Sequence, residues 1–386
     1  MLVAVPLLVG GLLELPLGLV AGDGRRRQLL VLAGGAVFAA SLAATSLAGS
    51  FGLLLLTFVA FFPASGAFVS LSQAALMDAG PERRQQRMAA WNLAGSVGAV
   101  AGPLLLAAVL AAGGSWRSGY LLLAIAALAM LGAAAIAGPA RVAPAVSAPA
   151  AESDGATRTE RTERTERAAW LTAFTRAAAD LRHSAGQAAA ALRSRETARW
   201  LALLQVSDLL LDVLTGFVGV YLVDVAHASP THAAIGVAIR LGAGLVGDAL
   251  FASVAGRVRG RVALRASAIA ATILYPAFLI APGLGAKLAI LAALSVATAC
   301  WYPIAQAGLY DSLPGSSGIA VFLSSIAGLV GAVGPLTVGF VAQRFGLATA
   351  LAGLAVTPVA IAALTWRPSA PHALDSRGSV SLPDDD

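Results

Sequence analysis

Two aspartates lie within a long apolar stretch, where acidic side chains are rare. Asp208 and Asp212 are four residues apart within residues 200–223. A helix would place both carboxylates on one face, about 6 Å apart along its axis. Charged groups at membrane depth are costly, so they are kept for a partner or for a function. Because neighbouring carboxylates repel each other, one of them could hold a proton. The pair predicts a proton carrier, with a structural pair bonded to a neighbouring helix as the alternative.

One basic residue and two further acids lie within apolar stretches of their own. Arg240 is predicted at a depth similar to that of the two aspartates, where it either pairs with one of them or binds an anionic solute bidentately. Glu14 and Asp248 each lie about two turns from the predicted cytoplasmic end of a helix. We expect them as coupling or substrate-cavity residues near an inner gate, with caps or ion pairs with the neighbouring basic loops as the alternative. Other polar residues could line a cavity or simply pack: Gln73, Trp91, Asn92, Tyr302 and Gln306.

The composition indicates that lipid is the main solvent of the chain. Residues of the types AVILMFWYC make up 58% of 386 residues, charged residues make up 12%, and the mean hydropathy is +0.80. A helix of about 20 apolar residues crosses a bilayer and satisfies its own backbone there. We therefore predict an all-α polytopic membrane protein with eleven spans: residues 2–21, 29–47, 51–76, 88–112, 120–137, 200–223, 233–254, 262–281, 286–309, 319–341 and 347–366.

The distribution of Lys and Arg predicts the orientation. Of 26 such residues, all except Arg117, Arg240, Lys287 and Arg344 lie in alternate connections or in the tail, which places 22 on one side. This side is the cytoplasmic one by the positive-inside rule, so the C-terminus is predicted to be cytoplasmic in an inner or plasma membrane. Residues 139–198 form a charged cytoplasmic linker. Within it, residues 170–181 are either a surface helix or part of a solvated segment.

Several classes of function lack the residues that they need. The one cysteine, Cys300, and four histidines have no metal-ligand spacing, and no P-loop is present. An intramembrane enzyme would need a nucleophile with its base or a metal site. The basic residues form short clusters between spans, not a face with stacking aromatics. We therefore expect no enzyme, no metal or cofactor, and no nucleic acid partner.

A shift of 233 residues aligns the chain with itself. Residues 72–81 (SQAALMDAGP) align with residues 305–314 (AQAGLYDSLP), with Gln, Ala, Leu, Asp and Pro in common. Asp78 and Asp311, each with a proline three residues later, are assigned to helix termination and loop docking. Two halves in the same sense are a known plan of transporters. We predict an N-terminal bundle in residues 1–138 and a C-terminal bundle in residues 199–367, followed by a tail, residues 368–386.

The two predicted halves are unequal. The first contains five spans and the second contains six, because the counterpart of residues 200–223 would fall before residue 1. The repeat therefore predicts an ancestral plan of six plus six. We expect one more apolar helix to precede Met1.

Two helical halves, a long central loop and a basic loop near the start of each half resemble the major facilitator superfamily, without its usual first helix. Residues 18–27 (GLVAGDGRRR) resemble its loop motif, although they are shorter than the usual pattern. The second copy, residues 256–261 (GRVRGR), lacks the acid. The resemblance implies that Asp23, Arg25, Arg26 and Arg27 form a cytoplasmic gate.

A glycine-proline pattern resembles a motif of antiporter-type members of this superfamily. Gly95, Gly98 and Gly102 share one helix face that Pro103 ends, residues 113–117 (GGSWR) resemble the next loop, and Gly334–Pro335 is the second copy. Small residues let helices pack closely in lipid.

The resemblance implies alternating access and favours proton-coupled efflux of a drug or metabolite. The alternatives are an uptake symporter of the same fold and a truncated, non-transporting membrane protein. Expected partners are a small-molecule substrate, a proton and the lipid bilayer, with the chain as a monomer.

Overall fold

Helices account for nearly all of the part of the chain that the computed structural model describes: residues 6, 9–14, 24–137, 182–183, 185–313, 316–331 and 333–366. The N-terminal group contains α2 (Gly24–Ser46), α3 (Phe51–Asp78), the 3-10 turn η1 (Pro81–Arg83), α4 (Arg84–Ala111) and α5 (Trp116–Ala137). The C-terminal group contains α7 (Arg195–Asp224), α8 (Pro230–Val254), α9 (Gly260–Ile280), α10 (Leu284–Thr298), α11 (Trp301–Asp311), α12 (Ser317–Gly331), α13 (Val333–Phe345), α14 (Leu347–Gly353) and α15 (Val356–Trp366).

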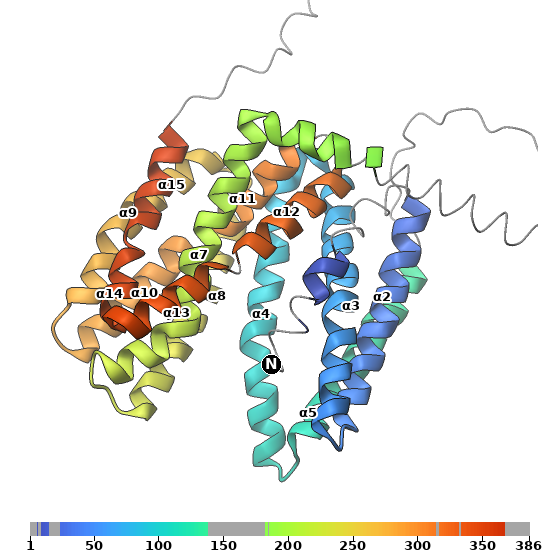
Figure 1. Cartoon of the computed structure of the whole chain (residues 1–386), viewed down its shortest axis with the longest axis horizontal. Coiled ribbons are helices and arrows are strands. Elements are labelled where there is room, and N and C mark those ends of the chain that lie inside the picture. The colour runs from blue at the N-terminus through green and yellow to red at the C-terminus, as the bar shows by residue number, and fades with distance from the viewer. Residues whose placement is uncertain are drawn as a thin grey trace, which may run out of the picture.

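The two groups lie side by side, and α4 stands between them (Figure 1). Helix α4 packs against α8 and α11 of the C-terminal group, and α12 packs against α3. Residues 185–193 form a helical segment across the top of Figure 1, after which α7 turns down into the bundle. The surface helix considered for residues 170–181 lies outside the described residues. The contacts between the groups converge on the upper end of the molecule in Figure 1, which carries the predicted cytoplasmic turns.

Ten helical segments in the described part of the chain are long and apolar enough to cross a membrane. Their positions match ten of the eleven predicted spans. The eleventh, residues 2–21, falls mostly outside the described residues. Within this span, residues 9–14 are described and are helical. The structure therefore supports an all-α integral membrane protein.

Two of the matching segments contain an internal break, although each of them is still one candidate span. The breaks lie between α10 and α11 and between α14 and α15. In both cases the second helix has a proline as its third residue: Pro303 and Pro358. A proline has no N–H to donate, and it is tolerated in a first turn, where that N–H would lack a partner anyway. Proline alone does not end a helix here, since Pro63, Pro103 and Pro276 lie inside unbroken helices.

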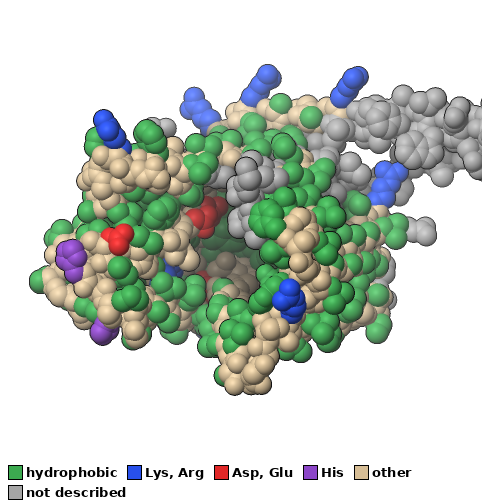
Figure 2. All heavy atoms as spheres, turned by 60° about the horizontal axis from the view of Figure 1, so that its bottom comes forward, with side chains coloured by type: hydrophobic (Ala, Val, Ile, Leu, Met, Phe, Trp, Pro, Cys, Tyr) green, Lys and Arg blue, Asp and Glu red, His purple; other side chains and the backbone are tan. Residues whose placement is uncertain are grey.

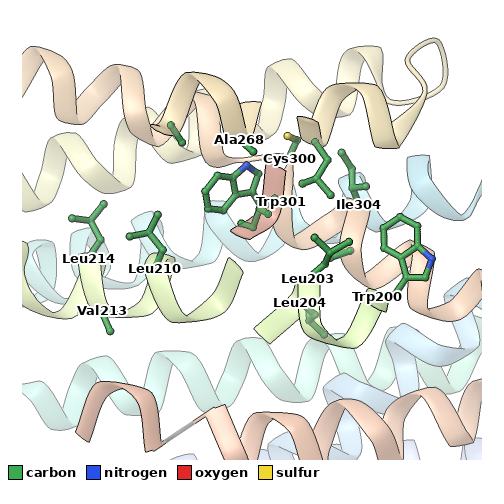
Figure 3. Packing of buried hydrophobic residues seen from close by; sticks show 14 of the residues in the cluster. Trp200, Leu203, Leu204, Leu210, Val213, Leu214, Ala268, Cys300, Trp301 and Ile304 are labelled. Carbon is green, nitrogen blue, oxygen red and sulfur yellow. The ribbon is translucent and has the colours of Figure 1, made fainter. Parts of the chain in front are cut away.

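The main hydrophobic core lies in the C-terminal group, around α7, α9 and α11. Figure 3 shows Leu203 and Leu210 of α7 near the Trp301 ring of α11, which is fully buried. Trp301 Nε1 donates a hydrogen bond to Ser267 Oγ at 2.7 Å, so its one polar atom is satisfied. Cys300 is buried beside this ring. The core fixes α7 and α11, two of the helices that line the cavity described below.

Helices α8 and α10 approach each other at Gly247. A Cβ atom at this position would lie 2.7 Å from Ala299 Cβ and 2.9 Å from Val296 Cα. Both are closer than a carbon contact allows, and one of them belongs to the backbone. In contrast, a Cβ at Gly98 of α4 would have nothing within 4 Å. Only the first glycine is required by the packing of this conformation.

The two glycines give a matched pair of substitutions. We expect Gly247→Ala to lower the free energy of unfolding by about 1–3 kcal/mol, because the added methyl group must push α8 and α10 apart. Gly98→Ala should not lower it and should raise it by up to about 1 kcal/mol, because the methyl group has open space and alanine favours a helix over glycine. Thermal unfolding in detergent measures both. Equal stability of the two variants would contradict the close approach of α8 and α10.

Candidate functional site

A cavity of about 350 Å³ lies between the two groups of helices. Its walls come from residues 10–14, α3, α7, α11 and α12, so both groups contribute. Figure 2 shows the surface hollowed between the groups, with acidic side chains inside, as seen from the lower end of Figure 1. That end carries the α2–α3 and α4–α5 turns, which are predicted to lie outside the cell. The polar residues of its wall include Glu14, Ser70, Gln73, Asp208, Tyr302 and Gln306.

Glu14 belongs to the wall of this cavity. Its Oε1 accepts a hydrogen bond of 2.5 Å from Ser70 Oγ of α3. A Cβ at Gly66 would lie 2.7 Å from the carboxyl carbon of Glu14, so the glycine leaves the room that this acid occupies. Glu14 was predicted as a coupling or cavity residue near the inner gate, with an ion pair to the basic loop as the alternative. In the structure it lines the cavity between the two groups.

The predicted pair of aspartates is divided between two environments. Asp208 is half-buried and lines the cavity, and it has no hydrogen-bond donor among the described residues. Asp212 is exposed and does not line the cavity, although its charge is close enough to interact with Arg240. The four-residue spacing does keep the two carboxylates within electrostatic range. Of the two, only Asp208 lines the cavity.

Two glutamines that the repeat relates to each other meet in the cavity. Gln73 of α3 and Gln306 of α11 are 233 positions apart, and Gln306 Nε2 donates to Gln73 Oε1 at 3.4 Å. Gln73 Nε2 lies 3.4 Å from the Tyr302 hydroxyl, and Gln306 Nε2 lies 3.4 Å from Ser324 Oγ. The two long, weak contacts of Gln73 link α3 to α11 across the boundary between the groups, and the contact with Ser324 links α11 to α12 within the C-terminal group. The repeat therefore brings equivalent residues to one place.

A smaller pocket of about 170 Å³ adjoins the cavity, and Tyr302 lines both. It contains Asp248 of α8, which accepts hydrogen bonds from Asn92 Nδ2 of α4 at 2.8 Å and from Ser96 Oγ of the same helix. Arg240 also lines it, is 8% exposed, and has a buried Nε without a partner. Arg240 makes no ion pair with a described carboxylate, although its charge interacts with the charges of Asp248 and Asp212. The pocket is thus separate from the carboxylates of the main cavity.

Ion pairs and hydrogen bonds hold the two groups together at the predicted cytoplasmic end. Asp78 of α3 accepts from Arg27 Nη1 at 2.6 Å and from Ser317 Oγ of α12 at 2.6 Å, and Arg27 Nη2 donates to Ser317 Oγ at 2.9 Å. Arg84 of α4 pairs with Asp311 of α11 at 3.0 Å. These contacts close the end of the molecule opposite the hollow in Figure 2.

The closure uses two further donors that reach across to the other group. Arg84 Nη1 donates to the Tyr310 carbonyl at 3.1 Å. Gln85 Nε2 donates to the carbonyls of Ala255 and Val258 at 2.7 and 3.1 Å. The Arg84 guanidinium and the Gln85 amide therefore bond to carbonyls at the end of α11 and in the turn that follows α8.

The gate predicted from the sequence overlaps this closure only in part. Arg27 is buried within it, whereas Arg26 is exposed, and Asp23 and the side chain of Arg25 lie outside the described part. Asp78 and Asp311 had been assigned to helix termination, and Arg84 and Ser317 had not been considered. A signal was present: Asp78 and Asp311 are 233 positions apart, and so are Arg84 and Ser317. The repeat thus crosses the boundary twice, by Asp78–Ser317 and by Arg84–Asp311.

The close packing predicted for the glycine face of α4 is not present in this conformation. A Cβ at Gly95, Gly98 or Gly102 would meet nothing within 4 Å. The reason is that α4 contacts α8 through Asn92 and Ser96, while the face beyond them borders open space. Pro103 lies inside the continuous helix α4. The second copy does pack closely, since a Cβ at Gly334, next to Pro335, would lie 2.5 Å from Leu209 Cδ1 of α7.

An all-helical membrane protein with a polar cavity between two groups of helices and a closure at one end has the architecture of a transporter. The profile described as Major Facilitator Superfamily matches residues 1–320 of the 386. The chain belongs to the Major Facilitator Superfamily. The predicted family and the all-α fold class are therefore confirmed. Among the described residues, no group of three or more His, Cys, Asp or Glu side chains could hold a metal ion.

Solved structures of this superfamily share the fold. FucP in the outward conformation matches with a TM-score of 0.64 and 16% identity, over 94% of this chain and 88% of that chain. Another structure of FucP is described as the E. coli fucose:proton symporter. The human organic anion transporter MFSD10 (TETRAN) matches with a TM-score of 0.69 and 20% identity, over 94% and 83%. The proton:xylose symporter XylE, bound to 6-bromo-6-deoxy-D-glucose, matches with a TM-score of 0.64 and 14% identity, over 94% and 84%. A search of curated protein sequences gave no match.

Proposed function

We propose that this chain is a proton-coupled secondary transporter that exports a small solute by alternating access. The observation that carries the proposal is one cavity with walls from both groups of helices and a carboxylate from each: Glu14 from helical residues 9–14 and Asp208 from α7. A carboxylate can take up and release a proton, and a cavity shared by two bodies can face either side when they rock. Binding and proton transfer would then occur at the same place.

The contacts at the predicted cytoplasmic end support alternating access. The contacts between the groups, Ser317–Asp78 and Arg84–Asp311, occur at one end, while the hollow opens at the other. We interpret this as the outward-facing state. In the inward-facing state these contacts would separate. The open glycine face of α4 would then meet neighbouring helices, which gives the glycine-proline motif a role in the second state.

Export is the direction that the motif on α4 favours, whereas FucP and XylE are described as proton symporters. The two directions differ in how the proton affects the solute. In export by antiport, the proton and the solute displace each other from the cavity. In uptake by symport, each favours binding of the other. We propose antiport, because the cavity offers carboxylates and, among its described lining residues, no basic group that would hold an anion beside a bound proton.

Transport by reconstituted protein tests this proposal. Liposomes with an imposed pH gradient would be given labelled amines, alcohols and carboxylates of similar size. Antiport predicts that a transported solute accumulates in liposomes with an acidic interior and that counterflow persists without a gradient. Accumulation in liposomes with an alkaline interior would show symport. Solute movement that is the same with an acidic and with an alkaline interior would contradict proton coupling.

A further inference from the structure

The unsatisfied polar groups of the cavity are hydrogen-bond acceptors. Asp208 has no donor among the described residues, and Glu14 has only Ser70. Gln306 is 3% exposed, and its Oε1 is buried without a partner, although both contacts of its Nε2 are made within the cavity wall. A buried acceptor without a donor is unfavourable, so a bound molecule that supplies donors would be stabilised here.

The charged side chains of the cavity wall are acidic, so they also attract hydrogen-bond donors. Among its described lining residues are two carboxylates and no basic side chain. Arg240 is the described basic residue in the adjacent pocket, and it does not line the main cavity. Its charge interacts with the charges of Asp248 and Asp212. The carboxylates of Glu14 and Asp208 are therefore left for a charge that comes from outside the protein.

We infer that the solute is an organic cation with N–H donors, such as an ammonium or guanidinium compound, that binds between Glu14 and Asp208 with Gln306 as a third acceptor. The inference rests on the proposed function and adds the charge class of the solute. Hydrogen bonds between a charged donor and a carboxylate are stronger than neutral ones, which gives the selection for a cation. The tyrosine hydroxyl of Tyr302 and the amides of Gln73 and Gln205 provide the neutral part of the wall.

Protons and the cation must then compete for the same two carboxylates. The helices α3 and α12 contribute no ionisable group to the cavity wall. The ionisable groups that face this region are Glu14 from helical residues 9–14, Asp208 and Asp212 from α7, Arg240 and Asp248 from α8, and Tyr302 from α11. Protonation of Glu14 or Asp208 removes an attractive charge, so acidification weakens binding of a cation and leaves binding of a neutral solute unchanged. This competition is what antiport requires.

Binding of three matched probes to the purified full chain tests the inference. Benzylguanidine and benzylurea have nearly the same shape, but only the first is a cation, and its guanidinium stays charged across the working pH range. Phenylacetate is an anion of similar size. We expect benzylguanidine to bind about tenfold or more tightly than benzylurea and more tightly than phenylacetate. Lowering the pH should weaken binding of benzylguanidine only.

Variants locate the effect. Asp208→Asn should weaken binding of benzylguanidine about tenfold or more and leave benzylurea unchanged. Asp224→Asn, an exposed aspartate at the far end of the same helix, is the control that should bind like the unaltered chain. Gln306→Leu removes the third acceptor and should also weaken benzylguanidine, which keeps the test valid if Asp208→Asn fails to fold.

The inference is overturned if benzylurea or phenylacetate binds as tightly as benzylguanidine, if both cavity variants bind benzylguanidine normally, or if none of the probes binds. Its failure is distinct from failure of the proposed function. Proton-coupled flux of a neutral or anionic solute would leave the transporter in place without the cation. Selective binding of benzylguanidine without any coupled flux would support the cation site and contradict the proposed transport function.

Discussion

Asp208→Asn is expected to abolish proton-driven transport while solute exchange persists at saturating solute concentration. Asp208 lines the cavity and has no described hydrogen-bond donor, so asparagine preserves its shape and removes its ability to carry a proton. Exchange moves solute both ways without net proton transfer, and it therefore does not need that carrier. Gradient-driven flux and counterflow in the same liposomes, each normalised to folded protein, measure the difference.

Asp212→Asn is the informative comparison, because it changes the same residue type one helical turn away. Asp212 is exposed and lies outside the cavity wall, so most of the proton-driven flux should remain. If Asp208 instead has a structural role, its variant should lose abundance and exchange together. Equal loss of proton-driven flux in both variants would show that the pair acts as a unit, and full activity of Asp208→Asn would remove the coupling role from this residue.

Asp78→Ala is expected to open the predicted cytoplasmic end. Asp78 accepts from both Arg27 and Ser317, and Arg27 is 9% exposed. Removal of one partner of a buried ion pair typically costs about 3–5 kcal/mol, because the other charge is left unpaired. The ion pair itself lies within the N-terminal group, whereas the hydrogen bonds of Ser317 with Asp78 and Arg27 join the two groups only in the closed state. Loss of Asp78 weakens that junction, so the equilibrium should shift toward the state in which this end is open. Asp78→Asn combined with Arg27→Gln should restore much of the closure.

A single reporter cysteine can measure that shift. Cys300 is the only cysteine, so Ser324→Cys in a Cys300→Ala background places one accessible thiol in the cavity wall. A membrane-impermeant thiol reagent should label it only from the predicted outer side in the background chain. With Asp78→Ala, labelling from the cytoplasmic side should appear. Glu82→Ala, an exposed acid at the same end, is the control and should leave labelling one-sided. Two-sided labelling of the background chain would show that the ion pairs do not close this end.

The spans and the cavity acids follow from local properties of the sequence. Long apolar runs predict membrane helices wherever they occur, and an acid such as Asp208 inside one of them draws attention because its burial is costly. The repeat also carries through to tertiary structure, since Gln73 and Gln306 align in sequence and meet in space. In these cases one helix, or one alignment, contains the information.

Other features depend on how separate helices are packed. Asp212 shares a helix face with Asp208, but the edge of the cavity falls between them, and helical spacing does not say where that edge lies. The closure by Arg84 and Asp311 joins residues 227 positions apart that have no local pattern in common. The glycine face of α4 illustrates a third case. Its packing is a property of the conformation, and in the present one that face is open.

The most direct measurement is the internal pH of liposomes that contain the unaltered chain and a trapped pH dye, after a gradient of benzylguanidine is applied. If the proton and an organic cation exchange through one cavity, inward movement of benzylguanidine should raise the internal pH. Asp208→Asn should remove this change and retain counterflow. Entry of benzylguanidine through the protein with no change in internal pH would contradict a proton-coupled cavity.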